Sequence, residues 1–385
     1  MRTADSVHHV GLNAIFLQPR MGGLETYVRQ LVPALLEVRP GLRLSLFVNE
    51  LGRKALAGES WAESVEFVTH PLLGRPYMRS VTEATLLGKL ATRQGVDVLQ
   101  NIAMVGPFRT AAPQITTIAD TTWLRYRDPA EWIPTLIWRT LVPSAARRAR
   151  RVLVFSEAAK KQVAEDLRVE TGRIDVVPLG PGLEPTSDPT PDRELRSRLA
   201  LGNGPIVLCV APVRAHKNVE RLLEALPVIR RAIPTATLVL PGNLTEHVGG
   251  LRGRAAALGV EDALVLPGWV DEADLEGLYA AASCFVLPSL NEGFGLPLLE
   301  AMRRGVPVAC SDASSLPEVA GDAAAYFDPH SPDEIAAAVI RLLTDREYAR
   351  SLSAKGHQRQ LEFTWERAAE KTLIVYERAL ATTRA

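Results

Sequence analysis

Two glutamates and a glycine-rich turn make up the part of the sequence with the clearest chemical signature. Glu292 and Glu300 are separated by seven residues in the run NEGFGLPLLE, which follows the apolar run CFVLPS. This pattern predicts a strand, a turn and a helix opened by Pro297, with unpaired backbone N–H groups and the positive helix end at the turn. Such a turn can hold a diphosphate, and the two carboxylates can accept hydrogen bonds from sugar and ribose hydroxyls. The alternative is that both glutamates are solvated surface residues.

Glycines set the shape of this motif. Gly293 and Gly295 let the backbone approach a ligand closely. The helix is expected to end where Arg303, Arg304 and Gly305 provide C-terminal signals.

A pair of cations forms the second motif. Arg214 and Lys217 lie in the run VRAHKN, directly after the apolar run IVLCVA. Two cations three residues apart at the carboxyl end of a strand can point into one site and neutralise a diphosphate. A surface cluster beside a helix capped near Asn218 is an equally good interpretation of this run taken alone.

Apolar runs alternate with helical patterns along the whole chain, which is typical of parallel sheets with crossover helices. In the first half the predicted strands are LSLFV, VEFVTH, DVLQ, QITTIAD and RVLVFS, and in the second half PIVLCVAP, TATLVLPG, ALVLPGWV, ASCFVLPS and GVPVACSD. The run GPGLEPTSDPTP, with four prolines and two glycines, lacks any period and is the best linker candidate. The pattern predicts an α/β fold of two Rossmann-like, doubly wound domains that face a central ligand cleft.

The expected boundaries follow from these patterns. We expect a first domain over 1–182, a linker over 183–193, a second domain over 194–364 and a helix over 365–385 that packs as a terminal cover.

Composition limits the classes of function. Lysine plus arginine equals aspartate plus glutamate, 44 against 44, so no overall field favours nucleic acid. The three cysteines lie in apolar runs and suit neither a disulfide framework nor a zinc site, which favours a cytoplasmic chain. We find no signal peptide and no spanning segment. A basic run, Arg147, Arg148, Arg150 and Arg151, could contact anionic lipid at the inner face of a membrane, although a solvated helix end is favoured.

The two motifs together resemble the family-4 retaining glycosyltransferases of GT-B fold, which carry an Arg-x-x-Lys pair and a Glu-x7-Glu motif in this order. The resemblance spans nearly the whole chain. Its further features are Gly22-Gly23 before a helix, the strand ending at Asp120, Ser156, the run VVPLG, the run PGWV and the closing Trp365 helix.

The resemblance implies a role for each matching residue. Arg214 and Lys217 would hold the pyrophosphate, with the backbone at Phe294, Gly295 and Leu296 completing its cradle. Glu292 would contact the transferred sugar, and Glu300 the ribose. The backbone near Val270 would read the base edge, and Gly23, after Gly22, would approach the phosphate from the first domain. The closing helix would cross back onto the first domain.

One departure from the family concerns Ala119, at a point where members often carry a histidine near the 6-hydroxyl of the sugar or the reaction centre. Asp120 is the nearest polar substitute, either as a catalytic residue or as a cap of the following turn. Because alanine could accommodate a methyl group, the donor is also hypothesised to be a 6-deoxyhexose.

The resulting prediction is a hexosyltransferase that takes a hexose or deoxyhexose from a nucleotide diphosphate sugar, with GDP-mannose favoured. The acceptor would be a glycan, a lipid-linked molecule or a small molecule, and no cofactor or metal is expected because the sequence contains no Asp-x-Asp. The alternatives are a GT-B epimerase and a noncatalytic nucleotide-sugar-binding protein. A nicotinamide dehydrogenase is disfavoured because no Gly-x-Gly-x-x-Gly follows the first strand.

Overall fold

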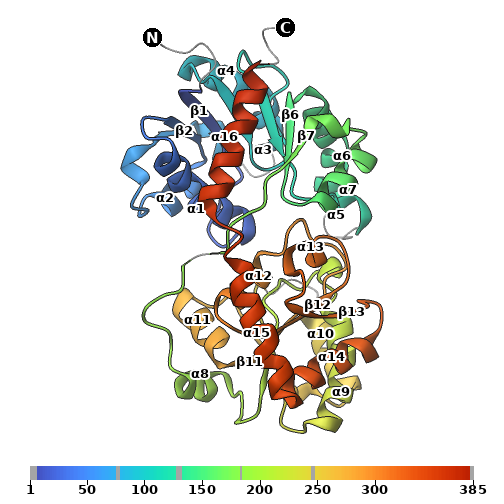
Figure 1. The fold of residues 1–385 in the computed structure, drawn as a ribbon. Coiled ribbons are helices and arrows are strands. Elements are labelled where there is room, and N and C mark those ends of the chain that lie inside the picture. Colours follow the sequence, from blue (N-terminus) through green and yellow to red (C-terminus); the bar gives the residue numbers. More distant parts are fainter. Residues whose placement is uncertain (1–6, 75–78, 127–131, 183, 244–247, 382–385) are drawn as a thin grey trace. The chain divides into compact units, whose positions relative to one another are not determined.

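The chain folds into two α/β units (Figure 1). The computed structural model describes residues 7–74, 79–126, 132–182, 184–243 and 248–381. Unit 1 comprises Met1–Gly180 and Phe363–Ala385, and unit 2 comprises Pro181–Glu362. Residue 183, where the predicted linker begins, and residues 382–385 of the predicted closing helix lie outside the described residues.

Unit 1 contains a seven-stranded parallel sheet in the order β3-β2-β1-β4-β5-β6-β7. The strands are β1 (His9–Asn13), β2 (Arg43–Phe47), β3 (Glu66–Val68), β4 (Val98–Asn101), β5 (Gln114–Thr117), β6 (Arg151–Val154) and β7 (Ile174–Val176). The strand order reverses between β1 and β4, which is the topological switch point of a doubly wound sheet.

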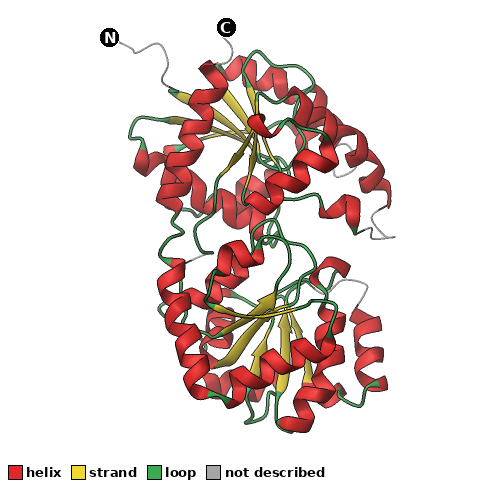
Figure 2. Ribbon diagram, turned by 45° about the vertical axis from the view of Figure 1, so that its right-hand side comes forward, coloured by secondary structure: helices red, strands yellow, loops and turns green. Residues whose placement is uncertain are grey.

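Helices lie on both sides of this sheet (Figure 2). They are α1 (Gly23–Val38), α2 (Glu50–Leu56), α3 (Arg79–Thr85), α4 (Leu87–Gln94), α5 (Thr122–Arg125), α6 (Trp132–Arg148), α7 (Glu157–Leu167) and the closing α16 (Trp365–Ala381). Helix α16 packs beside α1 and against β4, β5 and β6. The end of the chain therefore completes unit 1.

A buried polar network fixes α16 to the sheet of unit 1. The hydroxyl of Tyr376 in α16 donates to Gln100 in β4 at 2.5 Å. The amide of Gln100 in turn donates to Tyr27 of α1 at 3.0 Å and to Thr117 of β5 at 2.8 Å. Because buried polar groups are costly unless they are paired, this network specifies how α1, α16 and the sheet fit together.

Unit 2 contains a six-stranded parallel sheet in the order β10-β9-β8-β11-β12-β13. The strands are β8 (Ile206–Leu208), β9 (Thr237–Pro241), β10 (Leu264–Gly268), β11 (Ala282–Leu287), β12 (Val308–Ser311) and β13 (Ala324–Phe327). The order reverses between β8 and β11. Both sheets thus agree with the predicted Rossmann-like, doubly wound architecture.

The helices of unit 2 also lie on both sides of its sheet (Figure 2). They are α8 (Asp192–Leu199), α9 (Val219–Ala232), α10 (Val248–Ala257), α11 (Glu272–Ala281), α12 (Leu296–Arg303), α13 (Leu316–Ala320), α14 (Pro332–Thr344) and α15 (Arg346–Gln360). A core cluster joins the apolar faces of α9, α10 and α14 to the sheet. All three cysteines are buried and free, as expected.

The predicted linker is partly structured. Helix α8 already begins at Asp192, two residues before the predicted start of the second domain at 194. Before it, Thr190 donates its hydroxyl to Asp274 at 2.7 Å and its backbone N–H to the carbonyl of Ala273 at 3.0 Å. These contacts attach the end of the segment to α11 of unit 2. Within the described parts of the chain, no helix is long and apolar enough to span a bilayer.

Candidate active site

The two chemical motifs follow the two strands that flank the switch point of unit 2. The run 214–217 follows β8, and the run 289–295 follows β11, its neighbour in the sheet. Ligands of open parallel sheets bind beyond the carboxyl ends of the strands at such a point. A further backbone hydrogen bond, from the N–H of Leu290 to the carbonyl of His216 at 2.8 Å, joins the two loops directly.

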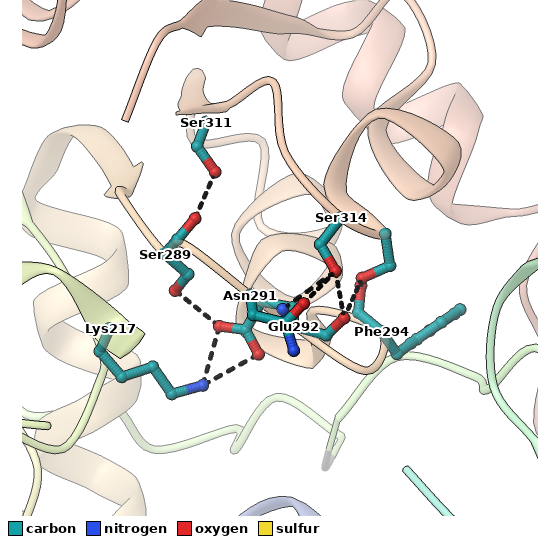
Figure 3. Close-up of polar contacts among 8 residues, drawn as sticks. Lys217, Ser289, Asn291, Glu292, Phe294, Ser311 and Ser314 are labelled. Carbon is teal, nitrogen blue, oxygen red and sulfur yellow. Dashed lines mark hydrogen bonds and ion pairs between the residues drawn. The ribbon is translucent and has the colours of Figure 1, made fainter. Parts of the chain in front are cut away.

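Lys217 and Glu292 form an ion pair at this point (Figure 3). The Nζ atom of Lys217 lies 2.8 Å from Oε1 and 2.9 Å from Oε2 of Glu292, and the hydroxyl of Ser289 donates to Oε1 at 2.7 Å. Glu292 is only 8% exposed. Burial acts to raise the pKa of Glu292, but the Lys217 ammonium and the Ser289 hydroxyl outweigh it, so the pKa lies below its ordinary value. Glu292 is therefore a carboxylate at neutral pH.

Serines at the end of β12 and in the loop after it hold the Glu292 turn in place (Figure 3). Ser311, the last residue of β12, donates to the carbonyl of Ser289 at 2.6 Å. Ser314 and Ser315 donate to the carbonyl of Glu292 at 2.8 and 3.0 Å, and Ser315 also donates to the carbonyl of Phe294 at 2.9 Å. The loop after β12 thus binds carbonyl oxygens of the turn, and the hydroxyl of Ser314 also accepts a hydrogen bond from the backbone N–H of Glu292 at 3.3 Å.

The predicted strand, turn and helix are confirmed. Helix α12 begins after Gly295, has proline in its first turn at Pro297, and is followed by Gly305. Gly295 has a φ of 109°, and a Cβ atom at this position would lie 2.8 Å from Cδ2 of Leu316. Both observations require glycine. The turn places the positive end of α12 beside the Lys217–Glu292 pair.

The remaining residues of the cation motif have separate tasks. Arg214 is half-buried at the start of a single 3₁₀ turn, Ala215–Lys217. Burial and the neighbouring Lys217 ammonium lower the pKa of His216 to about 4, so its imidazole is neutral at pH 7. Asn218 does not cap α9 with its side chain. Its amide instead donates to the carbonyls of Pro288 and Pro329 at 2.9 and 2.7 Å, which ties the loop to the end of β11.

Glu300 lies one turn into α12 and is held by α11. The hydroxyl of Tyr279 donates to Oε2 of Glu300 at 3.0 Å. Burial raises the pKa of Glu300, against the opposing effects of the Arg304 guanidinium and the Tyr279 hydroxyl. Arg304 itself is paired with Glu276 at 2.6 Å. Glu300 is thus part of a packed polar cluster and is not a solvated helix-surface residue.

The other predicted donor-binding residues lie at comparable strand ends. Val270 is half-buried, two residues after the end of β10 in unit 2. In unit 1, Gly22 and Gly23 follow β1 at the switch point of that sheet and open α1. Gly22 has a φ of 69°, in the left-handed region that favours glycine.

Asp120 follows β5 in unit 1 and caps the next turn. Its Oδ1 accepts a hydrogen bond from the backbone N–H of Thr122 at 2.8 Å, at the start of α5. The same turn is anchored by Thr121, whose hydroxyl donates to Asp166, and Asp166 is paired with Arg125 at 2.9 Å. Asp120 therefore has a structural task, and its role in the reaction stays a prediction.

Several residues at the site were missed by the sequence analysis, namely Ser289, Ser311, Ser314, Ser315, Tyr279 and Gly182. Ser289 and Ser311 lie near the ends of the predicted strands ASCFVLPS and GVPVACSD, and Ser314 and Ser315 follow the second. Polar residues at neighbouring strand ends were thus the signal that could have found them.

Metal and lipid were both considered in the sequence analysis. Among the described residues, no three His, Cys, Asp or Glu side chains gather into a group that could hold a metal ion. In the basic run of unit 1, Arg151 is paired with Asp175 at 2.6 Å and Arg148 lies 4.8 Å from the ring centroid of Phe108. These two guanidinium groups are thus engaged within the protein.

The chain contains two doubly wound parallel sheets, which is the architecture of the GT-B class of fold. The second sheet carries a cation–glutamate pair and a helix N-terminus at its switch point. Comparison with known families agrees. The model described as Glycosyltransferase Family 4 matches residues 21–183, and the model described as Glycosyl transferases group 1 matches residues 192–359. By these matches both halves of the chain are similar to glycosyltransferases of the family-4 type.

Relatives are similar in sequence over part of the chain, and solved structures are similar in fold. The chain is 46% identical to O-antigen chain mannosyltransferase B of Escherichia coli over 110 residues, which is 29% of each chain. It is 31% identical to the MMP α-(1→4)-mannosyltransferase of Mycolicibacterium hassiacum, over 63% of this chain and 58% of that protein. The matched parts thus span less than two thirds of either relative. The crystal structure of Anabaena HepE with UDP and glucose has a similar fold, with a TM-score of 0.70 and 18% identity over 98% of this chain and 99% of that one.

Proposed function

We propose that the protein is a retaining hexosyltransferase that moves mannose from GDP-mannose to a hydroxyl group of a glycan, lipid-linked or small-molecule acceptor. The observation that carries the proposal is the buried Lys217–Glu292 pair beside the N-terminus of α12, at the switch point of unit 2. A cation, a helix end and a carboxylate within one loop cluster match the diphosphate and the hydroxyls of a nucleotide sugar.

The reaction needs stabilisation of a leaving group. The bond between the anomeric carbon and the diphosphate oxygen breaks, its electron pair stays on the diphosphate, and the acceptor oxygen bonds to the same carbon. Arg214, Lys217 and the helix end stabilise the charge that develops on the diphosphate. The departing diphosphate takes the proton of the acceptor hydroxyl on the same face of the sugar, which gives retention. These cations stand in for a metal ion.

The choice of donor rests on the relatives. Both relatives described above are named mannosyltransferases, one of an O-antigen chain and one of MMP. Their names support mannose as the transferred sugar and a saccharide as the acceptor. Retention is supported by the resemblance to retaining family-4 enzymes described above.

A donor panel tests the proposal. The protein is incubated with GDP-mannose, UDP-glucose and their 6-deoxy counterparts, with saccharide acceptors, with and without a chelator. Release of nucleoside diphosphate and thermal shift are then measured. We expect GDP release from GDP-mannose that needs an acceptor and survives the chelator. Thermal stabilisation without release with any acceptor would instead favour a noncatalytic nucleotide-sugar-binding protein.

A further inference from the structure

The carboxylate of Glu300 is held between a buried phenol and a glycine backbone. On one side, the Tyr279 hydroxyl donates to Oε2 at 3.0 Å, and Tyr279 has no exposed surface. On the other side lies Gly182, in the segment that leads into α8. The two contacts come from parts of unit 2 that are about a hundred residues apart in sequence, so neither is imposed by α12 itself.

Tyr279 is fixed by charged neighbours. The guanidinium carbon of Arg304 lies 4.8 Å from the centroid of the Tyr279 ring. Arg304 donates to both carboxylate oxygens of Glu276 at 2.6 to 2.9 Å and to the carbonyl of Glu300 at 3.1 Å. The stacking and the hydrogen bond together hold the phenol with its hydroxyl at Glu300.

Gly182 is required for space. Its φ lies outside the left-handed region, yet a Cβ atom at this position would lie 1.8 Å from Oε1 and 2.5 Å from Cδ of Glu300. The atoms that would have to move are the end of a flexible side chain. Any side chain at position 182 would thus displace the Glu300 carboxylate.

We propose that Tyr279 and Gly182 are positioning residues that aim Glu300 at the ribose of the nucleotide, and so determine the preference of the site for ribonucleotides. The inference rests on the proposed function, in which Glu300 accepts hydrogen bonds from the ribose. Oε2 already accepts from Tyr279, which fixes the plane of the carboxylate and leaves its remaining lone pairs for the 2′- and 3′-hydroxyls.

The inference also makes binding sensitive to pH. The groups facing Glu300 are Tyr279 and Glu276 of α11 and Arg304, which directly follows α12, while Pro181 and Gly182 bring no charge. Burial raises the pKa of Glu300, and the Tyr279 hydrogen bond opposes that rise. Removing the hydroxyl therefore moves the loss of ribose binding on acidification to a higher pH.

The test is calorimetric titration of the full chain with GDP, 2′-deoxy-GDP and 3′-deoxy-GDP between pH 5 and 8. We expect native protein to prefer GDP. In Tyr279→Phe and in Gly182→Ala, we expect GDP binding to weaken about tenfold, and binding of each deoxy form, which keeps only one of the two hydroxyls, to weaken less. We also expect Tyr279→Phe to lose affinity for GDP at a higher pH than the native protein does as the solution is acidified.

The matched control is Tyr326→Phe. This tyrosine of unit 2 also donates one hydrogen bond, to the carbonyl of Gly321 at 2.5 Å, and it does not contact Glu300. We expect its GDP affinity and ribose preference to match the native protein.

The outcomes separate the two proposals. Equal weakening of GDP and both deoxy forms in Tyr279→Phe and Gly182→Ala, or full retention of the ribose preference, would overturn the positioning role. Failure of the native protein to bind GDP or UDP at all would overturn the proposed function itself.

Discussion

Replacing Lys217 with methionine leaves a buried carboxylate without its cation. Methionine keeps the length of the side chain but removes the ammonium that lies 2.8 and 2.9 Å from the two oxygens of Glu292. Glu292 then retains the hydroxyl of Ser289 as a hydrogen-bond donor. Loss of one partner from a buried ion pair typically costs about 3 to 5 kcal/mol.

Protonation sets an upper limit to this cost. Starting from the ordinary pKa of 4.5, protonating Glu292 at pH 7 costs about 3.4 kcal/mol, because each pH unit corresponds to about 1.36 kcal/mol. A carboxylate that is more costly than this to bury takes up a proton instead. At pH 5 the same limit is only about 0.7 kcal/mol. We therefore expect Lys217→Met to lose about 3 kcal/mol of unfolding free energy at pH 7 and under 1 kcal/mol at about pH 5.

The native protein has the opposite dependence on pH. The folded-state pKa of Glu292 is lowered, so its contribution to stability is present above 4.5 and is lost as the pH falls through the folded-state pKa. In Lys217→Met the folded-state pKa is raised, so the variant approaches the native protein as the pH falls. The double variant with Glu292→Gln has no charge to bury, and we expect it to recover most of the loss at pH 7.

The assay must report on unit 2 alone, because a chain with two units need not unfold in one step. Hydrogen exchange of the β8 and β11 peptides in increasing urea gives the unfolding free energy of this unit. Lys355→Met is the matched control. Its ammonium lies 2.8 Å from Asp322 in an exposed pair, and we expect no measurable change. Two results would refute the reasoning. One is equal unfolding free energies of Lys217→Met and the double variant at pH 7. The other is a difference in unfolding free energy between Lys217→Met and the native protein that stays constant down to pH 5.

Three shorter predictions concern the turn and the donor. Gly295→Ala forces a non-glycine residue to a φ of 109° with its Cβ 2.8 Å from Leu316, so we expect a loss of about 1 to 3 kcal/mol by calorimetry and weaker GDP binding. Asp120→Asn keeps an acceptor for the N–H of Thr122, so we expect an unchanged Tm. If the carboxylate acts in the reaction, kcat falls about 100-fold. An unchanged kcat would mean that Asp120 only caps the turn. With Ala119 at the end of the strand region, we expect a 6-deoxy donor to be used at least as well as its 6-hydroxy counterpart. A strong preference for the hydroxylated sugar in a kcat/KM comparison would contradict this.

The apolar strands could be predicted because their pattern is local. The strand β1 could not, since His9 and Asn13 are polar and are buried only because other strands supply partners. His9 is 2.8 Å from the hydroxyl of Ser45, and Asn13 donates to Asn101 at 3.4 Å. The edge strand β13 was also missed. Half of its sequence AAYF is alanine, which is uncommon in strands, so the run lacks the apolar pattern of a strand.

The site was predictable to the level of motifs. Lys217 and Glu292 were expected to serve one ligand because both follow strands, and the structure brings them together. That they pair with each other could not be predicted, since this depends on β8 and β11 being neighbours. The contacts of Glu300 with Tyr279 and Gly182 likewise depend on how α11, α12 and the segment before α8 pack. Tertiary neighbours therefore determine which predicted residues act together.

The pairing of Lys217 with Glu292 changes how donor binding should depend on charge. A diphosphate alone has to compete with Glu292 for the Lys217 ammonium, whereas a nucleotide sugar also brings hydroxyls that can donate to the carboxylate. We therefore expect Glu292→Gln to bind GDP more tightly than the native protein but GDP-mannose less tightly. Titration calorimetry with both ligands measures this crossover. A parallel loss of affinity for both would mean that Glu292 only holds Lys217 in place, because a carboxylate that recognises the sugar must affect the two ligands in opposite directions.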